Sequence, residues 1–163
     1  MSIARFLFSV LVSGVTGLAA ASPPEAPCPP EGDAVAVATR DHALWLCRQG
    51  WPVARFAVAL GRGGVDKRER GDARTPLGVY PLGDPRPSRR FRTFIPIGYP
   101  TSEQVAQGYS GGDVGIHGPD RRRAGVPMAA GDWTLGCIAT ATDGDLARIA
   151  SFVQEWRPAV VIR

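Results

Sequence analysis

The sequence predicts a mainly β domain with a few helices at its margins. Glycine and proline are frequent, at 20 and 15 residues in a chain of 163, and this favours many turns and short strands over a helical bundle. Hydrophobic residues make up 44% and charged residues 21%, which is close to globular averages and excludes wholesale disorder. The length leaves room for one domain of catalytic size but not for two.

The first 21 residues have the pattern of a secretory signal peptide. Arg5 precedes an apolar run over residues 6–18, and three alanines, Ala19 to Ala21, follow as a small-residue cleavage site. The run is shorter than the roughly 20 residues that a spanning helix needs, so cleavage near Ala21 is ranked above an uncleaved anchor. We therefore expect an exported protein, periplasmic or associated with the cell wall, with no stable membrane insertion after signal removal.

The charge balance is basic, with 19 lysine and arginine residues against 15 acidic ones. A basic surface favours anionic partners without selecting one. Because export is expected, we do not expect nucleic acid to be a partner.

Short apolar runs separated by turn residues predict about seven strands. They follow a proline-rich lead-in over residues 22–32 and belong to one domain over residues 33–163. The glycine-rich, charged stretch 61–72 is expected to form a loop that can close over a ligand. The expected strands are 33–39, 43–47, 53–60, 78–82, 92–99, 113–117 and 159–162.

Two helices are expected among these strands. Thr101 and Gln104 form a T-x-x-Q capping box, which predicts a short helix over residues 101–107. A second, longer helix is expected after Thr142, where four apolar residues follow the i, i+3, i+4, i+7 spacing: Leu146, Ile149, Ala150 and Val153.

The three cysteines are expected to divide into one disulfide and one free thiol. Export into an oxidising compartment favours a disulfide, and Cys28 and Cys47 are the two that lie close together in sequence. This pairing leaves Cys137 free. Zinc-like C-x-x-C or H-x-x-x-H spacings are missing and only 2 histidines are present, so no metal site is expected.

Cys137 is the candidate nucleophile and His117 the candidate base. A cysteine attacks a carbonyl as its thiolate, and a histidine commonly takes the proton. His42 lies in an expected hairpin turn and is interpreted as a surface residue. Gly136 allows a tight turn before the nucleophile, so the amides of Gly136 and Cys137 are expected to be free to bind a developing oxyanion. Without further context, a single Cys and a single His are more often structural than catalytic.

Three motifs in the same order resemble the catalytic domain of the L,D-transpeptidases, the YkuD-type peptidoglycan enzymes. His117-Gly118 corresponds to the family's His-Gly, and residues 134–137 (T-L-G-C) correspond to its Ser/Thr-x-Gly-Cys at a fitting spacing. Upstream, residues 71–80 resemble the segment R-T-P-x-G-x-Y, and residues 97–100 precede the histidine strand as they do in the family. The resemblance covers about residues 33–163 and implies a single β-sandwich domain.

The resemblance implies a cysteine-dependent transpeptidase that acts on peptidoglycan stem peptides without a metal or organic cofactor. Cys137 would attack the carbonyl of the third stem residue with His117 as base, and the terminal D-alanine would leave. An amine of a second stem, or a protein lysine, would then resolve the thioester. Water would give a stem-peptide hydrolase or amidase instead, and a non-catalytic cell-wall-binding module is a further alternative.

The motif around the nucleophile departs from the commonest family pattern. Leu135 stands where the family often has His, and Ala139 stands where it often has Arg. The motif D-W-T-x-G-C-I-A instead resembles a separate branch of the family. Arg74 or one of Arg121 to Arg123 is the candidate to meet the substrate carboxylate instead, although a solvated loop is the plainer interpretation of the triplet. The expected substrate-binding residues are Arg74, Tyr99, Gly118 and Thr134.

Overall fold

The computed structural model describes residues 27–123 and 131–163. The expected signal peptide and residues 22–26 of the lead-in therefore lie outside the described residues. Within the described part of the chain, no helix is both long and apolar enough to cross a membrane.

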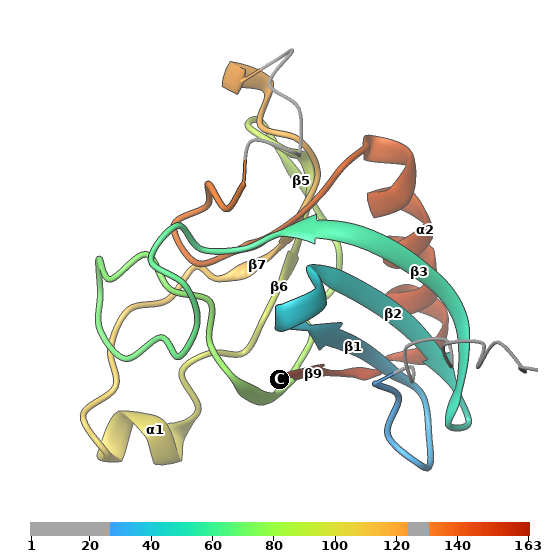
Figure 1. Ribbon diagram of the computed structural model, residues 1–163, viewed down its shortest axis with the longest axis horizontal. Helices are drawn as coiled ribbons and strands as arrows, with labels where there is room; N and C mark the ends of the chain where they lie inside the picture. Colours follow the sequence, from blue (N-terminus) through green and yellow to red (C-terminus); the bar gives the residue numbers. More distant parts are fainter. Residues whose placement is uncertain (1–26, 124–130) are drawn as a thin grey trace, which may run out of the picture.

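The described residues form a strongly curled sheet with two α-helices, α1 (Ser102–Ala106) and α2 (Asp143–Trp156) (Figure 1). The sheet has nine strands among the described residues, in the order β4-β9-β1-β2-β3-β8-β7-β6-β5. The prediction of a mainly β domain is confirmed. The strands are β1 (Ala34–Ala38), β2 (Ala43–Arg48), β3 (Trp51–Ala59), β4 (Gly78–Pro81), β5 (Arg86–Ser88), β6 (Arg92–Pro96), β7 (Gly115–His117), β8 (Ile138–Thr140) and β9 (Ala159–Ile162).

Two strands, β5 and β8, were not expected from the sequence. Each has three residues, which is too short for an alternating pattern to be recognised. Strand β8 pairs with the end of β3 and with β7, so it joins the two halves of the curled sheet. Cys137, the candidate nucleophile, directly precedes β8, and His117, the candidate base, is the last residue of β7.

Strand β1 is buried on both faces, which explains its uninterrupted apolar sequence. It pairs with β2 in antiparallel and with β9 in parallel orientation. Val35 and Val37 face the main core, whereas Ala34 and Ala36 face a smaller cluster with Cys47. Because side chains alternate along a strand, the valines and the alanines divide between the two faces.

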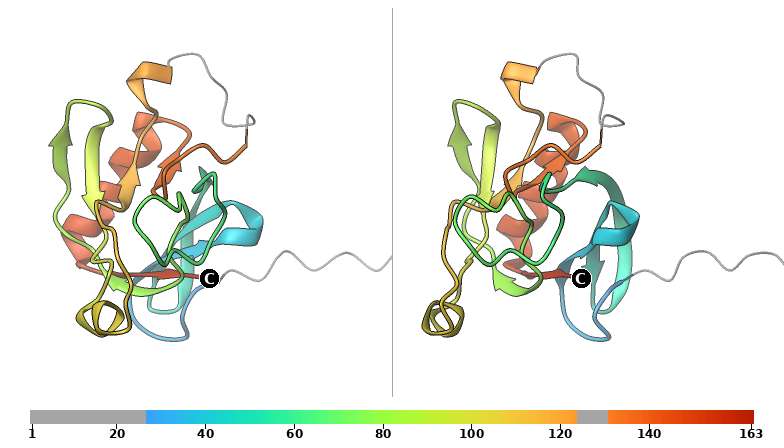
Figure 2. Two further views of the ribbon diagram at one scale, coloured as in Figure 1. Left: turned by 90° about the vertical axis from the view of Figure 1, so that its left-hand side faces the viewer. Right: turned by 60° about the vertical axis from the view of Figure 1, so that its left-hand side comes forward.

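Helix α2 packs its apolar stripe into the main core. Figure 2 shows it between the β5–β6 strands and the β1–β3 strands. Thr142 caps the helix by accepting a hydrogen bond from the Asp145 amide at 3.0 Å, as the Ser/Thr preference at this position predicts. The expected capping box of α1 is also present, between Thr101 and Gln104. The buried residues of α2 are Leu146, Ile149, Ala150, Phe152 and Val153.

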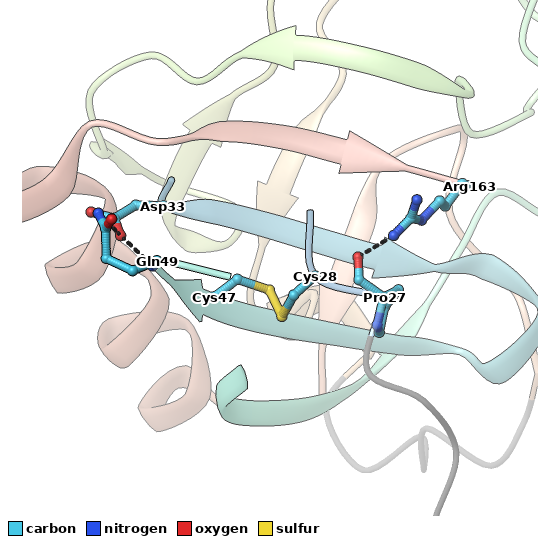
Figure 3. Close-up of a disulfide and its surroundings, with 6 residues drawn as sticks. All are labelled: Pro27, Cys28, Asp33, Cys47, Gln49 and Arg163. Carbon is cyan, nitrogen blue, oxygen red and sulfur yellow. Dashed lines mark hydrogen bonds between the residues drawn. A yellow bond between two sulfur atoms is a disulfide. The ribbon is translucent and has the colours of Figure 1, made fainter. Parts of the chain in front are cut away.

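A disulfide joins Cys28 to Cys47 of β2 (Figure 3). It ties the segment before β1 to the sheet, 19 residues away in sequence. The same segment is held at a second point, where the Arg163 guanidinium donates to the Pro27 carbonyl at 2.6 Å. This end of the domain is therefore held by a covalent link as well as by apolar burial.

Candidate active site

The parallel pairing of β7 with β8 places the candidate base and nucleophile on one face of the sheet. His117 is in register with Ala139, and Ile116 with Ile138. Side chains two residues apart on an extended chain share a face, so Cys137 lies on the side of Ala139 and His117. Ile116 and Ile138 point the other way, into the main core, and are fully buried.

A pocket of about 530 Å³ opens on this face, and both His117 and Cys137 line it. Segments far apart in sequence form its wall: the β5–β6 hairpin, the residues before β7, and the turn before β8. Its other lining residues include Arg86, Arg90, Phe91, Phe94, Asp113, Trp133, Thr134 and Leu135.

His117 is held in the tautomer that suits a base. Its Nδ1 lies 2.7 Å from the Gly118 carbonyl oxygen, and since a carbonyl only accepts, Nδ1 must donate and Nε2 carries the lone pair. Phe91 stacks on the ring, with 3.7 Å between centroids. Burial lowers the pKa of His117 to about 4, so the imidazole is neutral at pH 7 and able to accept a proton.

Cys137 rests as a thiol. Burial raises its pKa, although a hydrogen bond from the Gly115 backbone and the nearby charge of Arg90 oppose that rise. Its Sγ–H donates to the Asp113 carbonyl oxygen at 3.6 Å. With its pKa raised above the ordinary value, the Cys137 side chain is a neutral thiol at pH 7, beside a neutral imidazole in the same pocket.

The turn before Cys137 is organised by the Thr134 hydroxyl. It donates to the Cys137 carbonyl at 2.7 Å and accepts from the Gly136 amide at 3.1 Å, a local arrangement that threonine side chains favour. The expectation that the Gly136 amide is free for an oxyanion is therefore wrong. Gly136 is needed for its backbone, with φ of 124° and the Arg74 carbonyl oxygen only 2.5 Å from where a Cβ would stand.

Asp132 anchors the same turn to the end of β3. Its Oδ1 accepts from the Leu60 amide at 2.7 Å, and its Oδ2 lies 3.1 Å from His42 Nε2. The Thr134 amide also donates to the Leu60 carbonyl at 3.0 Å. His42, interpreted from the sequence as a surface residue, is half-exposed but also braces the nucleophile turn.

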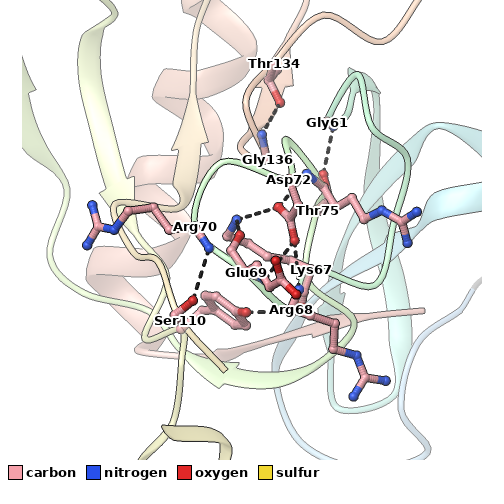
Figure 4. Close-up of polar contacts among 12 residues, drawn as sticks. Gly61, Lys67, Arg68, Glu69, Arg70, Asp72, Thr75, Ser110, Thr134 and Gly136 are labelled. Carbon is pink, nitrogen blue, oxygen red and sulfur yellow. Dashed lines mark hydrogen bonds and ion pairs between the residues drawn. The ribbon is translucent and has the colours of Figure 1, made fainter. Parts of the chain in front are cut away.

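The loop over residues 61–77 is held from within by a buried ion pair (Figure 4). Lys67 Nζ donates to Asp72 at 2.6 Å, and the lysine side chain is only 4% exposed. Burial by itself would raise the pKa of Asp72, but Lys67 and three backbone amides hold it well below its usual range. These amides belong to Arg68, Glu69 and Arg74.

Three of the expected substrate-binding residues, Arg74, Tyr99 and Gly118, are not among the residues that line the pocket. The Arg74 guanidinium donates to the Val65 carbonyl at 3.4 Å, and Tyr99 is buried against Tyr80 with its hydroxyl on the Lys67 carbonyl. The Gly118 carbonyl oxygen accepts a hydrogen bond from the His117 ring. Thr134 does line the pocket.

Two pocket arginines, Arg86 and Arg90, were missed by sequence reasoning. They lie at β5 and in its turn to β6, where three-residue strands leave no pattern to orient a side chain. Arg121 to Arg123 form a short 3₁₀ turn, and the part of that loop over residues 124–130 lies outside the described residues.

Comparison with protein families matches residues 32–162 to the YkuD model, described as the L,D-transpeptidase catalytic domain. A search of curated proteins found no match. Pgp2, the helical cell shape determining protein from Campylobacter jejuni, is similar in structure, with a TM-score of 0.68 at 24% identity over 81% of this chain and 47% of that chain.

Two further solved structures share the fold. Bd1075 from Bdellovibrio bacteriovorus has a TM-score of 0.61 at 17% identity, over 82% of this chain and 48% of that one. An L,D-transpeptidase from Mycobacterium smegmatis has a TM-score of 0.56 at 11% identity, over 80% of this chain and 58% of that one. This chain therefore spans about half the length of Pgp2 and Bd1075.

Proposed function

We propose, because the chain belongs to the L,D-transpeptidase catalytic-domain family, that it is a cysteine-dependent acyltransferase acting on peptidoglycan stem peptides. The observation that carries this proposal is the presence of one imidazole and one thiol in the same pocket, with His117 at the end of β7 and Cys137 directly before the parallel strand β8. The neutral base with its lone pair on Nε2 supports general-base activation of the thiol.

In the proposed first half-reaction, Cys137 Sγ attacks the carbonyl carbon of the third stem residue. His117 Nε2 takes the thiol proton as the C–S bond forms, and the carbonyl electrons move to oxygen. When the electrons return, the C–N bond breaks, and His117 gives its proton to the departing nitrogen of D-alanine. The product is a thioester on Cys137.

Only one of the two expected oxyanion donors is retained in the proposal. The Cys137 amide is proposed to stabilise the oxyanion. The Gly136 amide already donates to Thr134, so Gly136 contributes the turn that presents the nucleophile.

In the second half-reaction an acceptor attacks the thioester and regenerates the thiol. An amine of another stem, or a protein lysine, gives a new amide bond and makes the enzyme a transpeptidase. Water gives the shortened stem, and the enzyme is then a hydrolase with the same first half-reaction.

The test is incubation of the purified protein with disaccharide-tetrapeptides, followed by intact-protein mass spectrometry and product analysis. We expect D-alanine release and a covalent adduct that are both missing in Cys137→Ala, with cross-linked dimers as the product of transfer. Shortened monomers without dimers would identify the hydrolase. Binding without D-alanine release, together with a thiol inert to carbapenems, would support the wall-binding module and contradict the proposal.

Export is part of the proposal, with a signal peptide over residues 1–21, a lead-in over 22–32 and the catalytic domain over 33–163. N-terminal sequencing of the exported protein is expected to begin near Ser22. A start at residue 1 would contradict cleavage.

A further inference from the structure

Two arginines of the β5–β6 hairpin, Arg86 and Arg90, line the pocket of the candidate site together with the nucleophile turn. Ala139, two residues after the nucleophile, is fully buried and stands in register between Ala59 and His117, so β8 brings no charge to the pocket. Among the described residues that line the pocket, the arginines therefore come from the β5–β6 hairpin.

The Arg90 guanidinium is bound by the buried carboxylate of Asp120. Its Nε and Nη2 donate to Asp120 Oδ2 at 2.9 and 2.6 Å. The Asp120 side chain is 1% exposed, whereas that of Arg90 is 45% exposed. The second carboxylate oxygen, Oδ1, accepts from the Arg122 amide at 3.0 Å, so Asp120 itself is fixed from two sides.

The Arg90 guanidinium retains donors for a ligand. A guanidinium has five N–H donors in a planar fork, and the bonds to Asp120 use two of them. Its charge acts on the reacting groups, since it lowers the pKa of both His117 and Cys137. The next residue, Phe91, stacks on the His117 ring, which fixes the hairpin relative to the base.

The geometry points to Arg90 as the residue that binds the terminal carboxylate of the stem peptide, with Asp120 as its positioning residue. This inference rests on the proposed function, in which the terminal D-alanine is the leaving group. The carboxylate carbon of that residue is three bonds from the carbonyl carbon that Cys137 attacks, so its partner has to line the same pocket as the nucleophile. Arg90 would thereby restrict the enzyme to stems whose last residue has a free carboxylate.

The test measures binding in the Cys137→Ala background, where no turnover occurs. The two ligands are the disaccharide-tetrapeptide acid and its C-terminal carboxamide, which differ only in the charge that Arg90 would meet. We expect the acid to bind about 10- to 100-fold more tightly than the amide, as a hydrogen-bonded charge implies. Arg90→Gln, added to this background, should abolish the preference by weakening the binding of the acid alone. Asp120→Asn should weaken the binding of the acid by a smaller factor than Arg90→Gln does.

Arg89→Gln is the matched control. Arg89 is the exposed neighbour of Arg90, so its loss changes the net charge equally and should leave the preference intact. Equal weakening of both ligands by Arg90→Gln, equal binding of acid and amide before substitution, or loss of the preference in Arg89→Gln would each overturn the inference. If Arg90→Gln does not fold, Arg90→Lys gives the same comparison with a partial loss.

Failure of the inference and failure of the proposed function give different results. An acid preference that depends on Arg90, in a protein whose Cys137-containing form releases no D-alanine, supports the subsite and contradicts the enzyme. D-alanine release without an acid preference contradicts the subsite alone.

Discussion

The two halves of the curled sheet are stabilised in different ways. The half around β1, β2 and β3 has strands of five to nine residues, an inner strand buried on both faces, and a disulfide that joins Cys28 to β2. The half that carries the site has three-residue strands β5, β7 and β8. It depends on polar side chains that bind backbone groups, which are Asp72, Asp120, Asp132 and Thr134.

We expect this difference to separate the stability of the fold from the proposed chemistry. Apolar burial holds a scaffold without specifying any one atom closely, whereas hydrogen bonds to buried backbone groups fix orientation. Substitutions in the first half should therefore lower the stability of the fold and leave the chemistry of folded molecules unchanged. Substitutions in the second half should alter the chemistry, whether or not they also lower stability, and the following measurements test this division.

His117→Gln is expected to have the largest effect. Loss of the general base should slow acylation of Cys137 by about 10²- to 10⁴-fold, while the protein still folds because glutamine also has a donor for the Gly118 carbonyl. Stopped-flow acylation by a carbapenem and a thermal melt measure the two quantities. An unchanged acylation rate would remove His117 from the mechanism.

Asp72→Asn tests whether the polar half is held by its buried ion pair. Removing the charge leaves Lys67 buried with the Glu69 carbonyl but without its charged partner, so we expect a loss of about 3 kcal/mol in the free energy of unfolding, measured by urea denaturation. The control is Asp66→Asn, which removes the partner of Arg68 in an exposed pair and should cost less than about 1 kcal/mol. Similar losses in both variants would contradict a special role for Asp72.

Acid should weaken the fold through the buried imidazole. Burial lowers the folded-state pKa of His117 to about 4, whereas the unfolded imidazole titrates near about 6.5. Between these pH values the unfolded chain binds a proton that the folded chain does not, so the free energy of unfolding falls by about 3 kcal/mol as the pH falls through this window. Urea denaturation across it should show a steeper slope in the wild type than in His117→Gln, and equal slopes would contradict the assignment.

Cys28→Ser tests only the half of the sheet around β1, β2 and β3. Opening the link between residues 28 and 47 should lower the free energy of unfolding by about 2 to 4 kcal/mol, with the acylation rate of folded molecules unchanged. Cys137→Ser, which keeps the disulfide, is the control for stability. A lower acylation rate in folded Cys28→Ser would break the division between the two halves.

Local patterns in the sequence were sufficient for much of the scaffold. The alternating small apolar residues of β1, the capping box of Thr101 and Gln104, and the apolar stripe of α2 each depend on neighbours a few residues away. The pairing of Cys28 with Cys47 followed in the same way from proximity in sequence. The order of the His117 and Cys137 motifs was enough to indicate the family.

The details of the site depend on contacts that local sequence patterns do not specify. The engagement of the Gly136 amide by Thr134 depends on a turn geometry that composition does not specify. Arg74, expected at the substrate, donates to the Val65 carbonyl of its own loop. Arg90 lines the pocket, and its guanidinium is bound by Asp120, 30 residues away. Strands of three residues carry too little pattern to show which face a side chain takes.

The amino-acid sequence by itself thus determined the fold class, the local elements and the two residues on which the proposed chemistry depends, because these follow from periodicity and motif order. Only the tertiary structure decided which cations line the pocket, which amide stays engaged and how His117 is oriented. Those features arise from contacts between segments distant in the chain, and their free energy is gained only after the sheet has closed.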